Sequence, residues 1–277
     1  MDIILTGIAR SGTTLTCTLL NQGPQCVALH EPMAPGNFRS LPTESIASEI
    51  KQFFASQRAT LLAEGRALSK SREGRIPTNP FHAQRAEREE LRTSIVSQGW
   101  VHFDKKLIGN FRLAIKHPNF FTALLPILRL HFPCYAVVRN PLAALLSWQT
   151  ITAPIQQGRL PFAEAFSPSL TAQMANEEDR IARQILALDW YFKLYGTLLP
   201  RQHVIRYEDI IKSAGSVLSV IDPDASQLRQ PLDNRNRNPL YDRSLLRPLG
   251  ERLLSHPDHH FRQFYGDADI EALMAGS

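Results

Sequence analysis

Cysteine is scarce in this chain, which has only Cys17, Cys26 and Cys134 among its 277 residues. No two of them form a C-x-x-C pair, so the sequence indicates neither a structural zinc site nor a dithiol redox site. The count is odd, and each cysteine lies in or beside an apolar run. This pattern favours buried free thiols in a reducing compartment over a disulfide.

Long apolar runs are also missing. No window approaches the ~18 consecutive apolar residues that a transmembrane helix needs. A strand-like segment begins at Asp2, and no basic and apolar leader precedes it. We found no internal repeat and no low-complexity segment. The sequence therefore predicts a soluble, cytoplasmic protein without an integral membrane segment.

The composition is that of an ordinary globular protein, with 43% hydrophobic and 21% charged residues. At this length an α/β chain usually folds as one unit, so we expect a single domain over 1–277. The net charge of +5 favours anionic partners without choosing among them. Nucleic-acid binding is not indicated, because zinc spacing, an aromatic RNA signature and a dense basic stripe are all missing.

Apolar strand-like runs alternate with helical segments along most of the chain. The expected strands are 2–6, 25–30, 112–116, 134–138 and 203–206, and the expected helices between or after them are 15–21, 119–131, 141–149 and 181–199. This alternation predicts an α/β fold with a central parallel sheet covered by helices on both faces. Residues 34–100 interrupt it with two more helical stretches, at 46–68 and 83–98, which predict a helical insertion over the active site.

A glycine-bounded turn follows the first expected strand. Gly7 and Gly12 have the Gly-x4-Gly frame of a phosphate-binding loop, in which backbone N–H groups and the next helix face an anion. A nucleoside triphosphatase needs Lys after the second glycine, but this chain has Thr13 there. The cation lies inside the loop as Arg10, whose forked guanidinium suits a tetrahedral anion.

The strand at 134–138 ends in Arg139, where a metal-dependent P-loop enzyme would place a metal-binding Asp. A cation there suits a second phosphate better than a metal ion, so we expect no metal. Since ligands bind beyond the carboxyl ends of parallel strands, Gly12, Glu31, Lys116 and Arg139 should meet at one edge of the sheet.

Two segments together resemble the sulfotransferases that use 3'-phosphoadenosine 5'-phosphosulfate (PAPS). Residues 10–15 (RSGTTL) are similar to the family's 5'-phosphosulfate loop. Residues 135–141 (YAVVRNP), with Ser147 eight positions after Arg139, are similar to its 3'-phosphate motif. Residues 206–209 (RYED) give a weaker third similarity. Together these segments anchor about residues 1–31 and 112–213.

This resemblance implies a three-layer P-loop-like fold and a PAPS site. The 5'-phosphosulfate would be held by Arg10, Ser11, Gly12, Thr13 and Thr14. The 3'-phosphate would be held by Arg139 and Ser147, and a basic loop near the C-terminus offers Arg235 and Arg237 as further candidates. The product would be adenosine 3',5'-bisphosphate. The missing anchor argues mildly for a bacterial source.

The resemblance also implies catalytic roles. Glu31 lies twenty-one residues after Arg10, as the catalytic glutamate of tyrosylprotein sulfotransferases does, and is our first choice of general base. Lys116 would stabilise the bridging oxygen, assisted by Arg10. His117 is the rival base, but it directly follows Lys116, and we therefore expect its side chain to point to the opposite face.

Two other functions remain open on sequence grounds. A P-loop kinase for small molecules would need a lysine and a metal-binding carboxylate, and neither is found in place. A non-catalytic nucleotide-binding protein would leave Glu31 and Lys116 without a role. The acceptor, a hydroxyl or amine of a carbohydrate, lipid or small molecule, is not readable from the sequence, nor is the oligomeric state.

Overall fold

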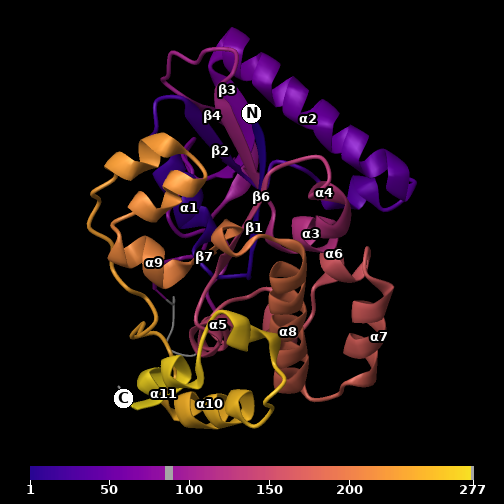
Figure 1. The fold of residues 1–277 in the computed structure, drawn as a ribbon, viewed down its shortest axis with the longest axis vertical. Helices are drawn as coiled ribbons and strands as arrows, with labels where there is room; N and C mark the ends of the chain where they lie inside the picture. The colour runs from indigo at the N-terminus through magenta and orange to yellow at the C-terminus, as the bar shows by residue number, and fades with distance from the viewer. Residues whose placement is uncertain (85–89, 276–277) are drawn as a thin grey trace.

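The computed structural model describes residues 1–84 and 90–275. A five-stranded sheet with the order β2–β5–β1–β6–β7 lies at its centre, and all neighbouring strands in it are parallel (Figure 1). The strands are β1 (Asp2–Gly7), β2 (Cys26–His30), β5 (Arg112–Lys116), β6 (Cys134–Val138) and β7 (Val204–Arg206). The predicted parallel α/β fold is confirmed.

Helices cover both faces of the sheet. Side chains alternate along β1, so that Ile4 packs into one apolar core while Ile3 and Leu5 pack into the other. The first core includes buried residues of α3 (Pro118–Ala123), α5 (Pro141–Trp148) and α8 (Arg180–Leu198), and the second those of α1 (Thr13–Leu20) and α9 (Tyr207–Lys212). The three predicted layers are therefore present.

The start of α5 fixes where β6 ends. The Asn140 side chain accepts hydrogen bonds from the backbone N–H groups of Leu142 and Ala143, at 3.0 and 3.3 Å. Pro141 occupies the first turn, where its missing N–H costs nothing. This cap places Arg139 in the short connection between the strand and the helix.

The single helix expected over 119–131 is divided into α3 and α4 (Leu125–Leu128). Pro126 explains the break, because it has no N–H to donate to the carbonyl four residues earlier. Further α-helices after α4 are α6 (Pro161–Glu164), α7 (Pro168–Asn176), α10 (Leu246–Leu254) and α11 (Asp267–Ala275). In Figure 1, α10 and α11 lie below α5, next to the C-terminus.

The insertion at 34–100 is helical only in its first half. Helix α2 (Thr43–Glu64) runs along the outside of the fold (Figure 1) and ends at Gly65, whose φ is 65°. Beyond it, β3 (Arg66–Ser71) pairs antiparallel with β4 (Ser97–His102). We call this pair the β3–β4 ribbon.

The helix expected over 83–98 is wrong for the described residues, and its part at 85–89 lies outside them. The Arg92 N–H donates to Thr150 O at 3.0 Å, and the Thr152 N–H donates to Arg92 O at 2.9 Å. These backbone groups therefore pair with another segment of the chain, and at Ser97 β4 begins.

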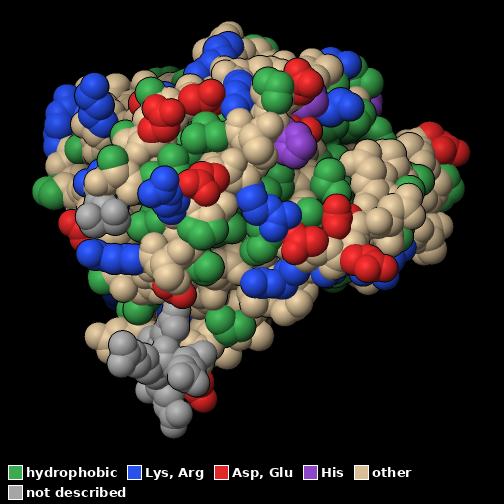
Figure 2. Space-filling model, turned by 90° about the horizontal axis from the view of Figure 1, so that it is seen from below, with side chains coloured by type: hydrophobic (Ala, Val, Ile, Leu, Met, Phe, Trp, Pro, Cys, Tyr) green, Lys and Arg blue, Asp and Glu red, His purple; other side chains and the backbone are tan. Residues whose placement is uncertain are grey.

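The three cysteines are free and buried, as predicted. In the described part of the chain, no helix is long and apolar enough to cross a membrane. On the face in Figure 2, basic and acidic side chains are interspersed, so the positive net charge does not gather there into one patch.

Candidate functional site

The turn between β1 and α1 has the curvature that its two glycines predict. Gly12 has φ 92°, and a Cβ there would lie 2.7 Å from the Tyr207 ring. A Cβ on Gly7 would lie 2.4 Å from Val137 O, so β6 and Tyr207 pack against the two ends of the turn. The first turn of α1 begins at Thr13, with N–H groups that have no intrahelical acceptor.

Two side chains hold the carbonyls of this turn. Trp148 Nε1 donates to Ala9 O at 2.8 Å, and Arg139 Nη1 donates to Arg10 O at 3.0 Å. Both come from the segment that follows β6. The N–H groups of Ile8 and Ser11 are also engaged, since they donate to Val137 O and Ile8 O at 3.0 Å. The N–H groups at the α1 terminus are therefore the main backbone donors available to a ligand.

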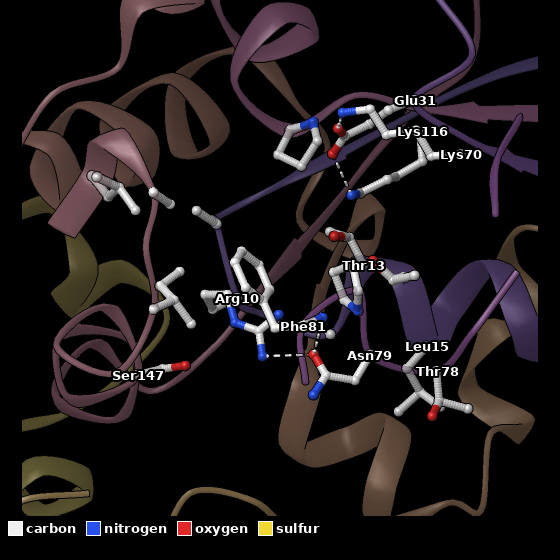
Figure 3. A pocket seen from close by; sticks show the side chains of 18 of the residues that line it. Arg10, Thr13, Leu15, Glu31, Lys70, Thr78, Asn79, Phe81, Lys116 and Ser147 are labelled. Atoms are coloured by element: carbon white, nitrogen blue, oxygen red, sulfur yellow. Dashed lines mark hydrogen bonds and ion pairs between the residues drawn. The ribbon is translucent and has the colours of Figure 1, made fainter. Parts of the chain in front are cut away.

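A pocket of about 770 Å³ opens over this turn. Its lining joins the turn to the ends of β2, β5 and β6 and to residues 231–241, which we call the C-terminal loop. Figure 3 shows several of its side chains. Ten of the residues singled out in the sequence line it: Arg10, Gly12, Thr13, Thr14, Glu31, Lys116, His117, Arg139, Ser147 and Arg235.

The two other predicted residues lie elsewhere. Ser11 is fully buried, and its hydroxyl donates to Val137 O at 2.7 Å, so it fastens the turn to β6. Arg237 lines a separate, shallower hollow, and its guanidinium donates to Ala272 O at 3.0 Å. Neither side chain lines the pocket.

Arg10 carries a positive charge that protein groups satisfy only in part. Its Nη2 donates to Asn79 Oδ1 at 2.9 Å, and its guanidinium lies over the Phe81 ring, 4.8 Å from the centroid (Figure 3). Its Nε is buried without a hydrogen-bond partner in the described structure. Burial, and then the charge of Arg92, lower the pKa of Arg10 to about 9. A guanidinium that is desolvated and repelled by a second cation would be stabilised by an anionic ligand, as in an anion-binding site.

Arg139 has two roles in the geometry. It lines the pocket, but it also donates to Asn236 Oδ1 at 2.8 Å, to Arg235 O at 2.5 Å and to Tyr241 Oη at 3.1 Å, besides Arg10 O. It is 4% exposed and lies over the Tyr207 ring. Four of its five N–H donors are thus engaged, and the guanidinium fastens the C-terminal loop to the glycine turn.

Ser147 faces the same pocket from α5, two turns after Arg139. In Figure 3 it lies at the end opposite Glu31, with Arg10 between them. The pocket therefore has two ends: Ser147 marks one, and Glu31 and Lys116 mark the other.

Glu31 directly follows β2 and has a left-handed backbone, at φ 47°, which is strained for a residue other than glycine. Its Oε1 accepts a 2.8 Å bond from Lys116 Nζ, and its Oε2 accepts a 2.6 Å bond from Lys70 Nζ. Burial alone would raise the pKa of Glu31, but Lys116, His30 and Lys70 outweigh it and hold the pKa well below its usual range. The carboxylate is therefore ionised at neutral pH.

His117 is oriented differently from a base that waits for a substrate. It is 5% exposed, and its Nε2 accepts the backbone N–H of Met33 at 3.1 Å. Burial is the main reason that the pKa of His117 is lowered to about 3, so the ring is neutral. Its imidazole does line the pocket, although we expected it to point to the opposite face.

Several lining residues carried no recognisable signal in the sequence. Lys70 comes from the β3–β4 ribbon, whereas Asn79, Phe81 and Arg92 lie between its strands. Tyr207 belongs to the RYED segment, and its hydroxyl accepts the Arg235 N–H at 3.0 Å. No short motif predicts contacts between segments so far apart in the chain, except at Tyr207.

The charges around the pocket are unbalanced. Among the described residues, the cations that line it are Arg10, Lys70, Arg92, Lys116, Arg139 and Arg235, and the carboxylates are Glu31 and Asp233. The lining therefore has the excess positive charge that a ligand with several negative charges requires. No group of three or more His, Cys, Asp or Glu side chains could hold a metal ion within the residues that the structure describes.

The chain matches no protein-family model and no curated protein sequence. Among solved structures, it is similar to a sulfotransferase from Alicyclobacillus acidocaldarius, with 13% identity and a TM-score of 0.44 over 99% of this chain and 95% of that one. It is also similar to the sulfotransferase STF9 from Mycobacterium avium, with 13% identity and a TM-score of 0.35 over 99% of this chain and 75% of that one.

Proposed function

We propose that this protein transfers a sulfuryl group from PAPS to a hydroxyl or amine of a small-molecule, carbohydrate or lipid acceptor. One observation carries the proposal. A single cationic pocket joins the glycine turn, the Arg139–Ser147 end and the paired Glu31 and Lys116. A nucleotide with an anion at each end and a reactive group near a carboxylate is the ligand class that this arrangement suits.

PAPS, when bound, supplies the sulfuryl group and a stable bisphosphate leaving group. The first turn of α1 and the hydroxyls of Thr13 and Thr14 would bind the phosphosulfate, and Arg10 would leave Asn79 to join them. Ser147 and the remaining N–H of Arg139 would bind the 3'-phosphate. The Ser11 hydroxyl would fasten the turn to Val137 of β6 and would not bind the phosphosulfate itself.

At the other end of the pocket, Glu31 would accept the proton of the acceptor as its oxygen or nitrogen attacks sulfur. The new bond to sulfur forms as the bond from sulfur to the 5'-phosphate oxygen breaks. Lys116 would meet the negative charge that builds on that oxygen. We assign the base to Glu31 over His117, because His117 Nε2 already accepts the Met33 N–H.

Ligand-induced stabilisation tests the proposal without knowledge of the acceptor. The melting temperature is measured with adenosine 3',5'-bisphosphate, with AMP and with ATP–Mg²⁺. A ligand at 100 times its Kd stabilises the native state by about 2.7 kcal/mol, which for a chain of this size is a shift of about 5 °C or more. We expect that shift with the bisphosphate, a smaller one with AMP and little with ATP–Mg²⁺.

The matched control is Ser147→Ala, which removes one hydroxyl from the proposed 3'-phosphate end. It should reduce the shift with the bisphosphate toward that with AMP and leave the AMP shift unchanged. A larger shift with ATP–Mg²⁺ than with the bisphosphate would favour a kinase. No shift with any of the three nucleotides would refute nucleotide binding altogether.

A further inference from the structure

The base proposed above is held from outside the central sheet. Ser69 Oγ accepts the His30 N–H at 2.9 Å, Lys70 Nζ donates to Glu31 Oε2 at 2.6 Å, and Gln98 Nε2 donates to Pro32 O at 2.6 Å. All three come from the β3–β4 ribbon, and in its register Lys70 is paired directly with Gln98. Lys70 and Gln98, which are neighbours across the ribbon, thus bind Glu31 and Pro32, the two residues of the turn that follows β2; we call this turn the corner.

That corner needs support. The φ of 47° at Glu31 costs free energy for a side-chain-bearing residue and persists only where surrounding contacts determine it. From the sheet side, the Glu31 N–H donates to Lys116 O at 2.8 Å. The ribbon supplies the contacts on the other side.

The two lysines on Glu31 differ in exposure. The Lys116 side chain is 4% exposed and rises from β5 inside the sheet, whereas the Lys70 side chain is 40% exposed. Lys116 is enclosed by protein, whereas Lys70 borders solvent. Oε2, the oxygen bonded to Lys70, is therefore the one that an incoming group can reach.

We propose that Lys70 is a positioning residue for the base, which holds Glu31 Oε2 toward the pocket until an acceptor hydroxyl or amine takes its place. This inference rests on the proposed function, since it assigns Glu31 as the base. When the acceptor donates a hydrogen bond to Oε2, it replaces the bond from the Lys70 ammonium. The positive charge that had lowered the basicity of Glu31 then moves away as the proton is transferred.

The groups that could titrate against Glu31 are Lys116, His30, Lys70, His117, Cys17 and Tyr191. Burial, as the first cause, lowers the pKa of His30 to about 4 and that of His117 to about 3, and it raises the pKa of Cys17 to about 12. Near neutral pH the two lysines therefore supply the positive charge on Glu31, and a change at Lys70 is read out at Glu31.

Carbon-13 NMR of glutamate side chains follows the ionisation of Glu31 directly, with Glu31→Gln for assignment. In the wild type we expect Glu31 to be ionised at pH 4. Lys70→Gln should raise its pKa by about 1 unit, the lower end of the effect of one opposite charge at contact distance. Lys70→Arg keeps the charge and should leave the wild-type titration nearly unchanged.

Gln98→Ala is the matched control, because it removes the bond to Pro32 O from the paired position without changing any charge. It should leave the Glu31 titration in place. Two outcomes would overturn the role of Lys70: the same midpoint of the Glu31 titration in Lys70→Gln as in the wild type, or equal displacement of that midpoint in Lys70→Arg and Lys70→Gln.

These titrations need no nucleotide, so they separate the two proposals. If adenosine 3',5'-bisphosphate stabilises both the wild type and Lys70→Gln but the titrations coincide, the sulfotransferase proposal stands and the role of Lys70 falls. If the bisphosphate does not bind, the enzyme proposal falls whatever the titrations show. Once an acceptor is known, Lys70→Gln should lower kcat about tenfold with an unchanged Kd for the bisphosphate, and Lys70→Arg should restore it.

Discussion

The guanidinium of Arg139 lies 3.0 Å from the backbone carbonyl of Arg10. This bond joins two segments that are 129 positions apart in the chain and that the sequence motifs treat as separate anion sites. It brings the end of β6 against the glycine turn, as the use of one nucleotide by both segments would require. The same side chain is also a structural fastener.

Replacement of Arg139 by alanine should therefore lower the stability of the fold as well as the affinity for PAPS. Its removal leaves Asn236 Oδ1 and the carbonyls of Arg10 and Arg235 without their donor, and we expect a loss of stability of about 3 kcal/mol. A role confined to the ligand would spare the fold. Urea denaturation without ligand measures the difference, and an unchanged unfolding free energy would contradict the fastening role.

Glu31→Gln keeps the shape of the side chain but removes the proposed base. We expect turnover to fall by ~10²- to 10⁴-fold, the range for a general acid–base group, while bisphosphate binding stays within about twofold of the wild type. His117→Asn is the comparison and should lower turnover less than ~10-fold. PAPS-dependent activity on a panel of acceptors measures both. Near-full activity of Glu31→Gln with an inactive His117→Asn would reverse the assignment.

Gly12→Ala should damage the donor end of the pocket. The added Cβ would lie 2.7 Å from the Tyr207 ring, and φ 92° is strained for alanine. We expect a loss of about 2 kcal/mol of stability and no measurable bisphosphate binding by calorimetry. Gly109→Ala is the control, since a Cβ there meets nothing within 4 Å. Normal binding by Gly12→Ala would show that the turn does not need its curvature.

Stability should depend on pH through the buried histidines. Burial lowers the folded-state pKa of His30 to about 4 and of His117 to about 3, whereas the ordinary value is 6.5. Between these values the unfolded chain binds more protons than the native state, so stability falls as the pH drops from 6.5 toward 4.5. The slope per histidine is at most about 1.4 kcal/mol per pH unit.

His117→Asn should reduce this slope, because one of the two groups no longer takes up a proton on unfolding. Unfolding free energies of the two proteins between pH 7 and pH 4.5 test it. Glu31 adds its own loss of stability only at more acid pH, since its pKa is depressed from 4.5. Parallel curves for the wild type and His117→Asn would contradict a buried neutral His117.

Much of the fold could be predicted because it depends on local pattern. Apolar runs of five residues bounded by Gly7, Glu31 or Arg139 predicted the strands, and Asn140–Pro141 predicted the start of α5. The helix over 83–98 could not be excluded locally, since the groups that replace its hydrogen bonds belong to Thr150 and Thr152. The structure of residues 90–96 therefore depends on backbone pairing with the segment at 150–152 and not on local helix propensity.

The candidate site divides in the same way. Residues at strand ends, such as Glu31 and Lys116, could be placed because parallel strands align their carboxyl ends. Lys70 could not, because its contact with Glu31 depends on how an outer ribbon lies across the sheet edge. Ser11 was placed in the correct turn, but the direction of its hydroxyl depends on the nearby Val137 carbonyl.

The bonds from Trp148 and Arg139 to the carbonyls of Ala9 and Arg10 imply that the turn already has its final shape in the free protein. Its conformational freedom is given up during folding, so a nucleotide need not order it on arrival. Under the proposed function, the backbone shape of the donor turn would then depend on β6 and α5, and the insertion at 34–100 would touch this turn only through the Arg10 side chain. Such a protein could change what it modifies by altering that insertion while its donor half stays as it is.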